Sequence, residues 1–130
     1  MSTPPTVLVI EDEEALQDAI KRKLGATGYT ILSAMSAEAG LKILETVTPN
    51  LIWLDLLLPG MGGFQFLETI RKQEKWKKLP VLVCSVSASP EKIHQAFQLN
   101  VIDYIVKSQY RLEDIVKKVT DLVEKQATAI

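Results

Sequence analysis

Five short runs of mostly apolar residues, separated by stretches with helical spacing, constrain the fold of this chain most strongly. A strand that alternates apolar and polar residues has one face in water, whereas a continuously apolar strand is buried on both faces. Most of these runs are continuous, although the length of one short run does not by itself exclude a buried helix. Alternation of such strands with helices is typical of an α/β fold whose parallel sheet is covered on both sides. The predicted strands are Val7–Ile10, Tyr29–Ala34, Leu51–Leu54, Val81–Cys84 and Tyr104–Val106.

Five helices are predicted between and after these strands, from their start signals and their apolar spacing. Ser36 and Ser89 are suitable N-caps, and Pro90 suits the first turn of the helix that follows Ser89. Apolar residues three or four positions apart form one face of each helix, which we expect to pack on the sheet. The inward-facing residues are predicted to be Leu16, Ile20 and Leu24; Ala37, Leu41, Leu44 and Val47; Phe64, Leu67 and Ile70; Ile93, Ala96 and Phe97; and Leu112, Ile115, Val116, Val119, Leu122 and Val123.

The chain has 130 residues, which suits one domain with a core of about residues 6–124 and short flexible termini. Its net charge of −1 gives no general reason to bind nucleic acid or anionic lipid. A basic stretch from Arg71 to Lys78 is better explained as a solvated helix end than as a nucleic-acid contact. The single cysteine, Cys84, cannot form an internal disulfide, and no apolar run is long enough for a membrane span or signal peptide. We therefore expect a soluble cytoplasmic protein in which Cys84 is a small core residue.

Side chains capable of chemistry follow four of the predicted strands. Asp12 follows the first strand, Asp55 the third, Ser85 the fourth and Lys107 the fifth. Right-handed crossovers place the carboxyl ends of parallel strands at one edge of the sheet, where folds of this kind bind their ligands. We therefore expect these four side chains to converge at that edge.

Each of these side chains also has a simpler interpretation. Asp55 precedes a turn rich in proline and glycine, from Pro59 to Gly63, and aspartates in such places often bond to their own backbone. Ser85 would then be a satisfied hydroxyl at a strand end, and Lys107 an exposed loop lysine. The joint placement of the four side chains favours a functional site over these separate explanations.

Glu11, Asp12 and Asp55 form an oxygen-only group of metal ligands. This set suits Mg²⁺, with Mn²⁺ as a substitute, rather than zinc or copper. Magnesium takes one or two carboxylates and leaves positions for phosphoryl oxygens. A carboxylate can itself accept a phosphoryl group as an aspartyl phosphate, so Asp55 is the predicted nucleophile. Lys107 would neutralise charge on the transferring oxygens, and Ser85 would donate a hydrogen bond to one of them.

The combination resembles the CheY-like receiver domain of two-component response regulators. The resemblance rests on Glu11-Asp12 after the first strand, the segment Asp55–Gly63, the hydroxyl of Ser85 and the segment Tyr104–Lys107. It implies a flavodoxin-like sheet with strand order 2-1-3-4-5. It also implies that a histidine kinase transfers a phosphoryl group to Asp55. The protein would therefore be a phosphoprotein, with Asp55 as its acceptor residue.

By the same resemblance, Mg²⁺ is held by Asp12, Asp55 and the backbone carbonyl of Leu57. Glu11 would act on the ion largely through water. These roles rest on the family pattern alone, since the spacing of the residues does not assign them.

The resemblance also implies how phosphorylation changes binding. In receivers the hydroxyl at the position of Ser85 moves toward the phosphoryl group while the aromatic at the position of Tyr104 turns inward, which alters the surface of the fourth helix, fifth strand and fifth helix. The implied partners are a sensor histidine kinase or phosphotransfer protein and an effector protein, without direct contact to nucleic acid or membrane. The implied protein is a stand-alone phosphorelay switch, either a monomer or a phosphorylation-dependent dimer. It would not be an enzyme, apart from catalysing its own phosphorylation and dephosphorylation.

Four residues depart from the pattern usual in receivers. Ser85 replaces threonine and keeps the hydroxyl, while Val86 replaces a small residue that lines access to the acid and is expected to hinder a phosphodonor. Asn100 replaces glycine, and asparagine tolerates the left-handed conformation of a helix end. Ser108 replaces a proline that often follows a cis bond, so the Lys107–Ser108 peptide bond is expected to be trans.

Leu57 and Ser87 are predicted to flank the path of the water that hydrolyses the aspartyl phosphate. An apolar leucine cannot orient that water, so slow self-hydrolysis is expected.

Two other functions remain open from the sequence. A degenerate receiver that binds partners without being phosphorylated would be consistent with Val86 and Ser108. A magnesium-dependent phosphohydrolase would use Asp55 as its nucleophile, but the chain has no cap insertion and carries Leu57 where a general acid is needed.

Overall fold

The computed structural model describes residues 3–128, apart from the side chains of residues 127 and 128. Strands and helices alternate along this part of the chain, as predicted. A short 3₁₀ turn, Lys107–Gln109, follows the last strand. In chain order the elements are β1 (Thr6–Ile10), α1 (Glu14–Gly25), β2 (Thr30–Ala34), α2 (Ala37–Leu44), β3 (Leu51–Leu54), α3 (Gly63–Arg71), β4 (Val81–Ser85), α4 (Pro90–Gln98), β5 (Asp103–Val106) and α5 (Leu112–Thr128).

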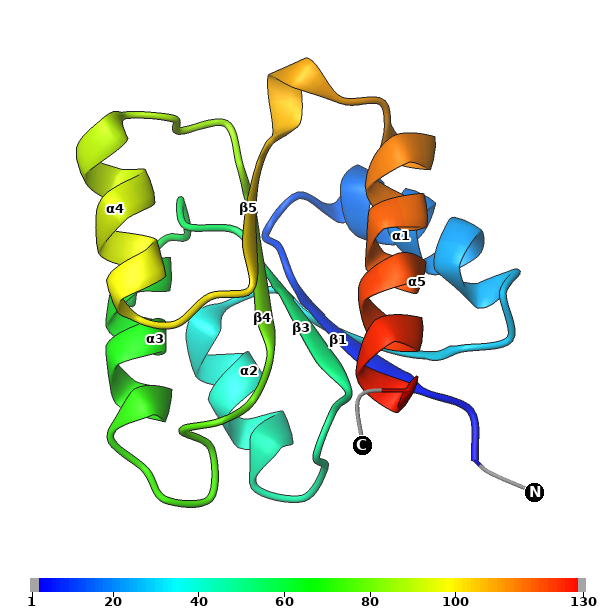
Figure 1. The fold of residues 1–130 in the computed structure, drawn as a ribbon, viewed down its shortest axis with the longest axis horizontal. Coiled ribbons are helices and arrows are strands. Elements are labelled where there is room, and N and C mark those ends of the chain that lie inside the picture. Colours follow the sequence, from blue (N-terminus) through cyan, green and yellow to red (C-terminus); the bar gives the residue numbers. More distant parts are fainter. Residues whose placement is uncertain (1–2, 129–130) are drawn as a thin grey trace.

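The five strands form one parallel sheet in the order β2-β1-β3-β4-β5. β1 pairs with β2 on one side, where Thr6 lies opposite Thr30, and with β3 on the other, where Val7 lies opposite Leu51. The predicted α/β class and strand order are therefore confirmed. Because all strands run in one direction, their carboxyl ends share one edge of the sheet, which lies at the top of Figure 1.

The sheet carries a separate apolar layer on each face. α2, α3 and α4 cover one face, and α1 and α5 cover the other (Figure 1). In β1, Leu8 and Ile10 belong to the first layer and Val7 and Val9 to the second, because successive side chains of a strand point to opposite faces. This burial on both faces is the reason why the strands are continuously apolar.

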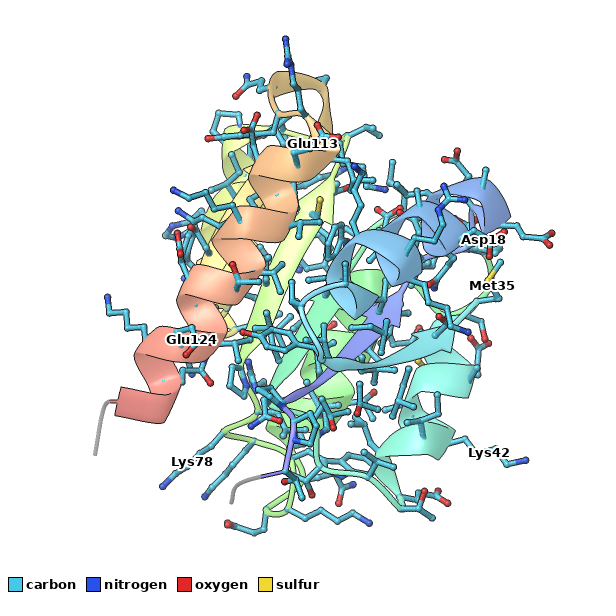
Figure 2. The ribbon with its side chains drawn as sticks, turned by 90° about the vertical axis from the view of Figure 1, so that its right-hand side faces the viewer. Asp18, Met35, Lys42, Lys78, Glu113 and Glu124 are labelled. Atoms are coloured by element: carbon cyan, nitrogen blue, oxygen red, sulfur yellow. The ribbon has the colours of Figure 1, made fainter. Side chains whose placement is uncertain are left out.

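α1 and α5 lie side by side on their face of the sheet, as Figure 2 shows. Lys23 of α1 and Glu113 of α5 join them through an exposed ion pair of 2.8 Å. Such an exposed pair contributes little to stability, so the two helices are held mainly by their apolar residues.

The predicted N-caps of two helices are confirmed. The Oγ of Ser36 accepts a hydrogen bond from the N–H of Ala39 at 3.1 Å, and that of Ser89 accepts from Lys92 at 3.3 Å. Pro90 is the first residue of α4, where its missing N–H costs no helical bond.

Two residues assigned to the predicted helix faces differ in the structure, Phe97 in its exposure and Val47 in its place outside a helix. Phe97 is 45% exposed, and Ala96 is the buried residue of α4, because this helix packs near the edge strand β5 and only a narrow stripe of it is covered. Val47 lies beyond α2, which ends at Leu44. In the opposite sense, Phe66 of α3 is fully buried although its position was not predicted to face inward.

Arg71, the last residue of α3, joins this helix to the segment that follows α4 and to the segment that precedes β4. Its guanidinium donates to the carbonyls of Leu99 at 2.7 Å and Asn100 at 3.2 Å, just beyond α4. It also donates to the carbonyls of Lys77 at 3.1 Å and Leu79 at 2.8 Å, in the loop before β4. Burial lowers the pKa of Arg71 below its ordinary value.

Two predictions about the backbone are confirmed. Asn100 has a φ of 60°, the left-handed conformation that ends α4. The peptide bond between Lys107 and Ser108 is trans. Within the described residues, every helix is too short or too polar to cross a lipid bilayer.

Candidate functional site

Three carboxylates lie together at the carboxyl edge of the sheet. Glu11 and Asp12 follow β1 directly and Asp55 follows β3, and one oxygen of each lies within 4.8 Å of the others. Glu11 is 1% exposed and Asp55 is 5% exposed, whereas Asp12 faces solvent. Two buried acids and one exposed acid can hold a divalent cation that keeps part of its hydration shell.

Lys107 places a positive charge between the two buried acids. Its ammonium donates to Asp55 Oδ2 at 3.1 Å and to Glu11 Oε1. Burial raises the pKa of Glu11 to about 7, although the hydrogen bond from Lys107 offsets part of this effect. Burial lowers the pKa of Lys107, but its bonds to Glu11 and its attraction to Asp55 outweigh burial and raise the pKa above its ordinary value. Lys107 is therefore a cation in direct contact with the predicted phosphoacceptor.

Asp55 both organises its turn and faces the acid cluster. Its Oδ1 accepts a hydrogen bond from the N–H of Leu57 at 3.0 Å, which is the turn-organising role that the sequence left open. Its Oδ2 is the oxygen that binds Lys107. The structural and functional interpretations of Asp55 are therefore compatible, because each uses a different oxygen.

Ser87 connects the end of β4 with two other elements. Its N–H donates to the Oγ of the fully buried Ser85 at 3.4 Å, and its own Oγ accepts from the ammonium of Lys92 in α4 at 2.7 Å. The hydroxyl of Tyr104 in β5 donates to the backbone carbonyl of Ser87. Burial, followed by repulsion from the negative charge of Asp55, raises the pKa of Tyr104. Two of the predicted switch residues, Ser85 and Tyr104, are thus joined through Ser87, whereas the third, Lys107, bonds to the acid cluster instead.

Two apolar side chains next to the site are open to solvent. Leu57 is 48% exposed and Val86 is 59% exposed, and each follows closely on a predicted site residue. The effect of Val86 on phosphodonor access and that of Leu57 on hydrolysis both stay predictions.

Gln17 supports the acid cluster, and it was not among the residues predicted for the site. This α1 residue is 4% exposed, and its amide nitrogen donates to the carbonyls of Val9 at 2.9 Å, Glu11 at 3.0 Å and Ala34 at 2.9 Å. The amide therefore ties the end of β1, where the acid pair begins, to the end of β2. A signal was present, because Gln17 lies three positions before Ile20 and so places a polar residue on the predicted inward face.

The chain matches a family model described as "Response regulator receiver domain" over residues 7–120. That range includes the acid cluster and Lys107. The transcriptional regulatory protein AfsQ1 of Streptomyces coelicolor is 33% identical over 103 residues, which are 79% of this chain and 44% of that protein. The chain spans about half the length, or less, of the curated relatives that it matches first.

Solved structures have the same fold. A CheY-like response regulator receiver domain protein from Methanospirillum hungatei is 26% identical, with a TM-score of 0.86 over 95% of this chain and 97% of that one. The Mn²⁺-bound form of response regulator Rcp1 is 25% identical, with a TM-score of 0.81 over 98% of this chain and 97% of that one. Both likenesses extend over nearly the whole chain.

Proposed function

The chain belongs to the response regulator receiver domain family, and we propose that it is a phosphorelay switch operated by a phosphoryl group on Asp55. A receiver of this family is a signalling domain and not an enzyme with a separate substrate. The placement of Lys107 carries the proposal, because its ammonium binds both Asp55 and Glu11 within the cluster of acids. The proposed unit is a single receiver domain with a core of about residues 6–124.

Mg²⁺ is the proposed cofactor, with Mn²⁺ as a substitute. The oxygen-only donor set fits a hard divalent cation, and the related regulator Rcp1 has a structure with Mn²⁺ bound. Asp12, Asp55 and the backbone carbonyl of Leu57 would hold the ion, and Glu11 would act through water. The bound ion would supply neutralising charge to the phosphoryl oxygens.

In the proposed transfer, an oxygen of Asp55 forms a bond to phosphorus while the bond between phosphorus and the donor's histidine nitrogen breaks. The nitrogen keeps the electron pair of that bond. Two hydrogen bonds, from Leu57 at 3.0 Å and from Lys107 at 3.1 Å, hold the Asp55 carboxylate in one orientation before transfer. This orientation favours an in-line attack, and Lys107 offsets charge on the transferring oxygens.

The proposed switch passes through Ser87. The bond between Ser87 N–H and Ser85 Oγ is long, at 3.4 Å, so the Ser85 hydroxyl is easily released toward a phosphoryl oxygen. Ser87 also contacts Tyr104 and Lys92, so a shift of this residue would reach β5 and α4 directly. The surface formed by α4, β5 and α5 would change as a result.

The proposed partners follow from this arrangement. A sensor histidine kinase or a phosphotransfer protein would supply the phosphoryl group in the cytoplasm, and an effector protein would bind the α4-β5-α5 surface. Phe97 of α4 is 45% exposed, and Tyr110, in the turn between β5 and α5, is 52% exposed. Both side chains offer that effector apolar contact area. We propose no direct contact with nucleic acid or membrane, and a monomer or phosphorylation-dependent dimer.

Incubation with Mg²⁺ and acetyl phosphate, followed by intact mass measurement, tests the proposal. We expect one phosphoryl group on the wild type and none on Asp55→Asn. The matched control is Asp18→Asn, which replaces an exposed aspartate of α1 (Figure 2) and is expected to accept one phosphoryl group. Omission of Mg²⁺ is expected to prevent the modification.

Two other outcomes would replace the proposal. An unmodified wild type would favour a degenerate receiver that binds partners without phosphorylation. Continuous release of phosphate without a lasting adduct would favour a phosphohydrolase.

A further inference from the structure

Two adjoining hollows form a groove at the amino ends of β4 and β5. The larger has a volume of about 350 Å³ and the smaller about 260 Å³, and Ile102 and Gln126 line both. Pro80 directly precedes β4 and Ile102 directly precedes β5, so the groove lies at the opposite end of these strands from the acid cluster. We call these two hollows the amino-end groove.

Arg71 contributes a positive charge to the wall of the amino-end groove. Three of the four carbonyls to which its guanidinium donates belong to Lys77, Leu79 and Asn100, which also line the larger hollow. The bonds from Nη1 to Lys77 and from Nη2 to Asn100 are exposed to solvent, whereas the bond from Nε to Leu99 is partly buried. A guanidinium has one more N–H than these four bonds use, so one N–H of Nη2 has no partner among the described residues.

The positive charge of this wall is not neutralised within the described residues. Lys78 also lines the larger hollow, and neither its ammonium nor the guanidinium forms an ion pair there. Three acids that are close in sequence to lining residues have partners of their own: Glu74 with Lys77 at 2.9 Å, Asp103 with Lys118 at 2.8 Å, and Glu124 with Tyr29 at 3.0 Å. An anionic group in the groove would therefore meet two cations that lack a counter-ion.

The floor of the amino-end groove is apolar. Leu79, Pro80 and Ile102 line the larger hollow, and Ile102 continues into the smaller hollow beside Leu122. Ile102 is 37% exposed, so part of this floor is open to a partner. A cationic rim around exposed apolar side chains distinguishes the groove from an ordinary solvated helix end.

The shape of the groove favours a peptide over a small free anion. Sites for small molecules bury roughly 70–90% of the ligand surface. Both hollows are more open than enclosed, so a small anion would keep much of its surface in water. A peptide can instead extend along both hollows, with its acidic and apolar side chains in contact with different parts of the groove.

We propose that the amino-end groove binds an acidic segment of a partner protein. A carboxylate of that segment accepts from the free N–H of Arg71 and from the ammonium of Lys78, in charge-assisted hydrogen bonds. An apolar side chain of the segment packs on Ile102. Because the groove lies away from Asp55, the interaction needs no phosphoryl group and is independent of the proposed switch.

Fluorescence anisotropy tests the proposal on the full chain, with a dye-labelled peptide of sequence Gly-Asp-Glu-Leu-Asp-Glu-Gly as the probe. We expect saturable binding that weakens as the salt concentration rises. In one matched peptide Asn and Gln replace the acids, and in another Ala replaces Leu; each is expected to bind several-fold more weakly. Asp55→Asn is expected to bind the acidic peptide as the wild type does.

Two variants examine the location of the site, and neither changes Arg71, which also supports the fold. Lys78→Gln is expected to weaken binding about threefold, the range for one exposed charge pair. Ile102→Ala is expected to weaken it several-fold. Lys42→Gln makes the same change of charge at an exposed residue of α2, on the other side of the view in Figure 2, and Met35→Ala shortens another exposed apolar side chain. Both controls are expected to leave the affinity unchanged.

The proposal is overturned if the acidic peptide gives no saturable binding or if its amide counterpart binds equally well. It is also overturned if Lys42→Gln weakens binding as much as Lys78→Gln, because the effect would then be one of overall charge. A labelled oligothymidine that binds more tightly than the acidic peptide would assign the groove to nucleic acid and would likewise overturn it.

Discussion

Both oxygens of Asp55 are already engaged before any phosphoryl group arrives. One accepts from the backbone of Leu57 and the other from Lys107, so attack on phosphorus requires one of these bonds to lengthen. Lys107 can follow the new group without leaving the cluster, since it also binds Glu11. Single side chains are therefore expected to set two separate quantities of the proposed reaction, the rate of phosphoryl transfer and the lifetime of the phosphorylated product.

Leu57→Asn is expected to shorten the lifetime of the phosphorylated form several-fold. Leu57 is 48% exposed beside Asp55, and an amide there can orient the attacking water, which leucine cannot. The decay of the phosphoryl adduct after removal of the donor measures this effect. Leu57→Met is the matched control and should decay as the wild type does. Equal decay of Leu57→Asn and wild type would contradict the prediction.

Gln17→Met is expected to weaken Mg²⁺ binding by about tenfold, the lower range for loss of a group that orients metal ligands. Methionine has nearly the same length but cannot donate to Val9, Glu11 and Ala34, so the acid pair loses its support. Loss of the three buried hydrogen bonds should also reduce the free energy of unfolding by about 1–3 kcal/mol, although the carbonyl of Ala34 still accepts from the N–H of Glu11.

Titration of the folded Gln17 variant with Mg²⁺, and its unfolding in urea, measure the two effects separately. Gln65→Met, at an exposed position of α3, is the matched control. A loss of stability with unchanged Mg²⁺ affinity would show that Gln17 does not position the acids.

The turn between β3 and α3 brings Asp55 into position, and this element depends on close backbone contact. A Cβ added at Gly63 would lie 2.6 Å from the Cα of Leu56 and 2.8 Å from the carbonyl oxygen of Asp55. Both neighbours are backbone atoms and cannot turn aside as a flexible side chain can. The N-terminus of α3 is therefore packed directly on the segment that carries Asp55, the proposed phosphoacceptor.

Gly63→Ala is expected to lower the free energy of unfolding by about 1–3 kcal/mol, because overpacking outweighs the gain in helix propensity. It should also reduce phosphorylation of Asp55, whose backbone must move. Gly25→Ala is the control, since an added Cβ there meets nothing within 4 Å at the end of α1. Urea unfolding of both variants measures the difference, and equal stability of the two would contradict it.

The strands and helices could be predicted from the sequence more completely than the side-chain contacts between them. Strands buried on both faces leave continuous apolar runs, and polar residues at their ends indicated the acid cluster and Lys107. The support from Gln17 and the bonds of Arg71 depend on which carbonyls lie within reach in the folded chain, and spacing does not reveal that. The prediction that Phe97 faces inward was wrong for a related reason, because the exposure of Phe97 depends on how α4 packs over the edge of the sheet.

The described part of the molecule has two apolar layers, one on each face of the sheet. Cys84 belongs to the layer under α1 and α5 and is fully buried, as predicted for a core residue. Burial raises the pKa of its thiol to about 12, from an ordinary value of 9.0. A reagent that needs the thiolate can therefore reach Cys84 only when the molecule opens.

The reactivity of Cys84 with a thiol reagent at mildly alkaline pH is expected to be very slow in the native protein and rapid in guanidinium chloride. The folded state holds the proton that the unfolded state releases, so the free energy of unfolding should fall as pH rises through about 9. Absorbance of the released reagent product and unfolding curves across this pH range measure both effects. Rapid modification in native buffer would contradict the burial of this thiol.

Arg71 gives α4 unequal support at its two ends. The C-terminal end of this helix is clamped, since the guanidinium binds the carbonyls of Leu99 and Asn100 together with the loop before β4. Its N-terminal end is attached through Ser87, which lies beside the predicted switch residues. If Asp55 is phosphorylated as proposed, a displacement at Ser87 is therefore expected to tilt α4 about its C-terminal end, where Arg71 holds it.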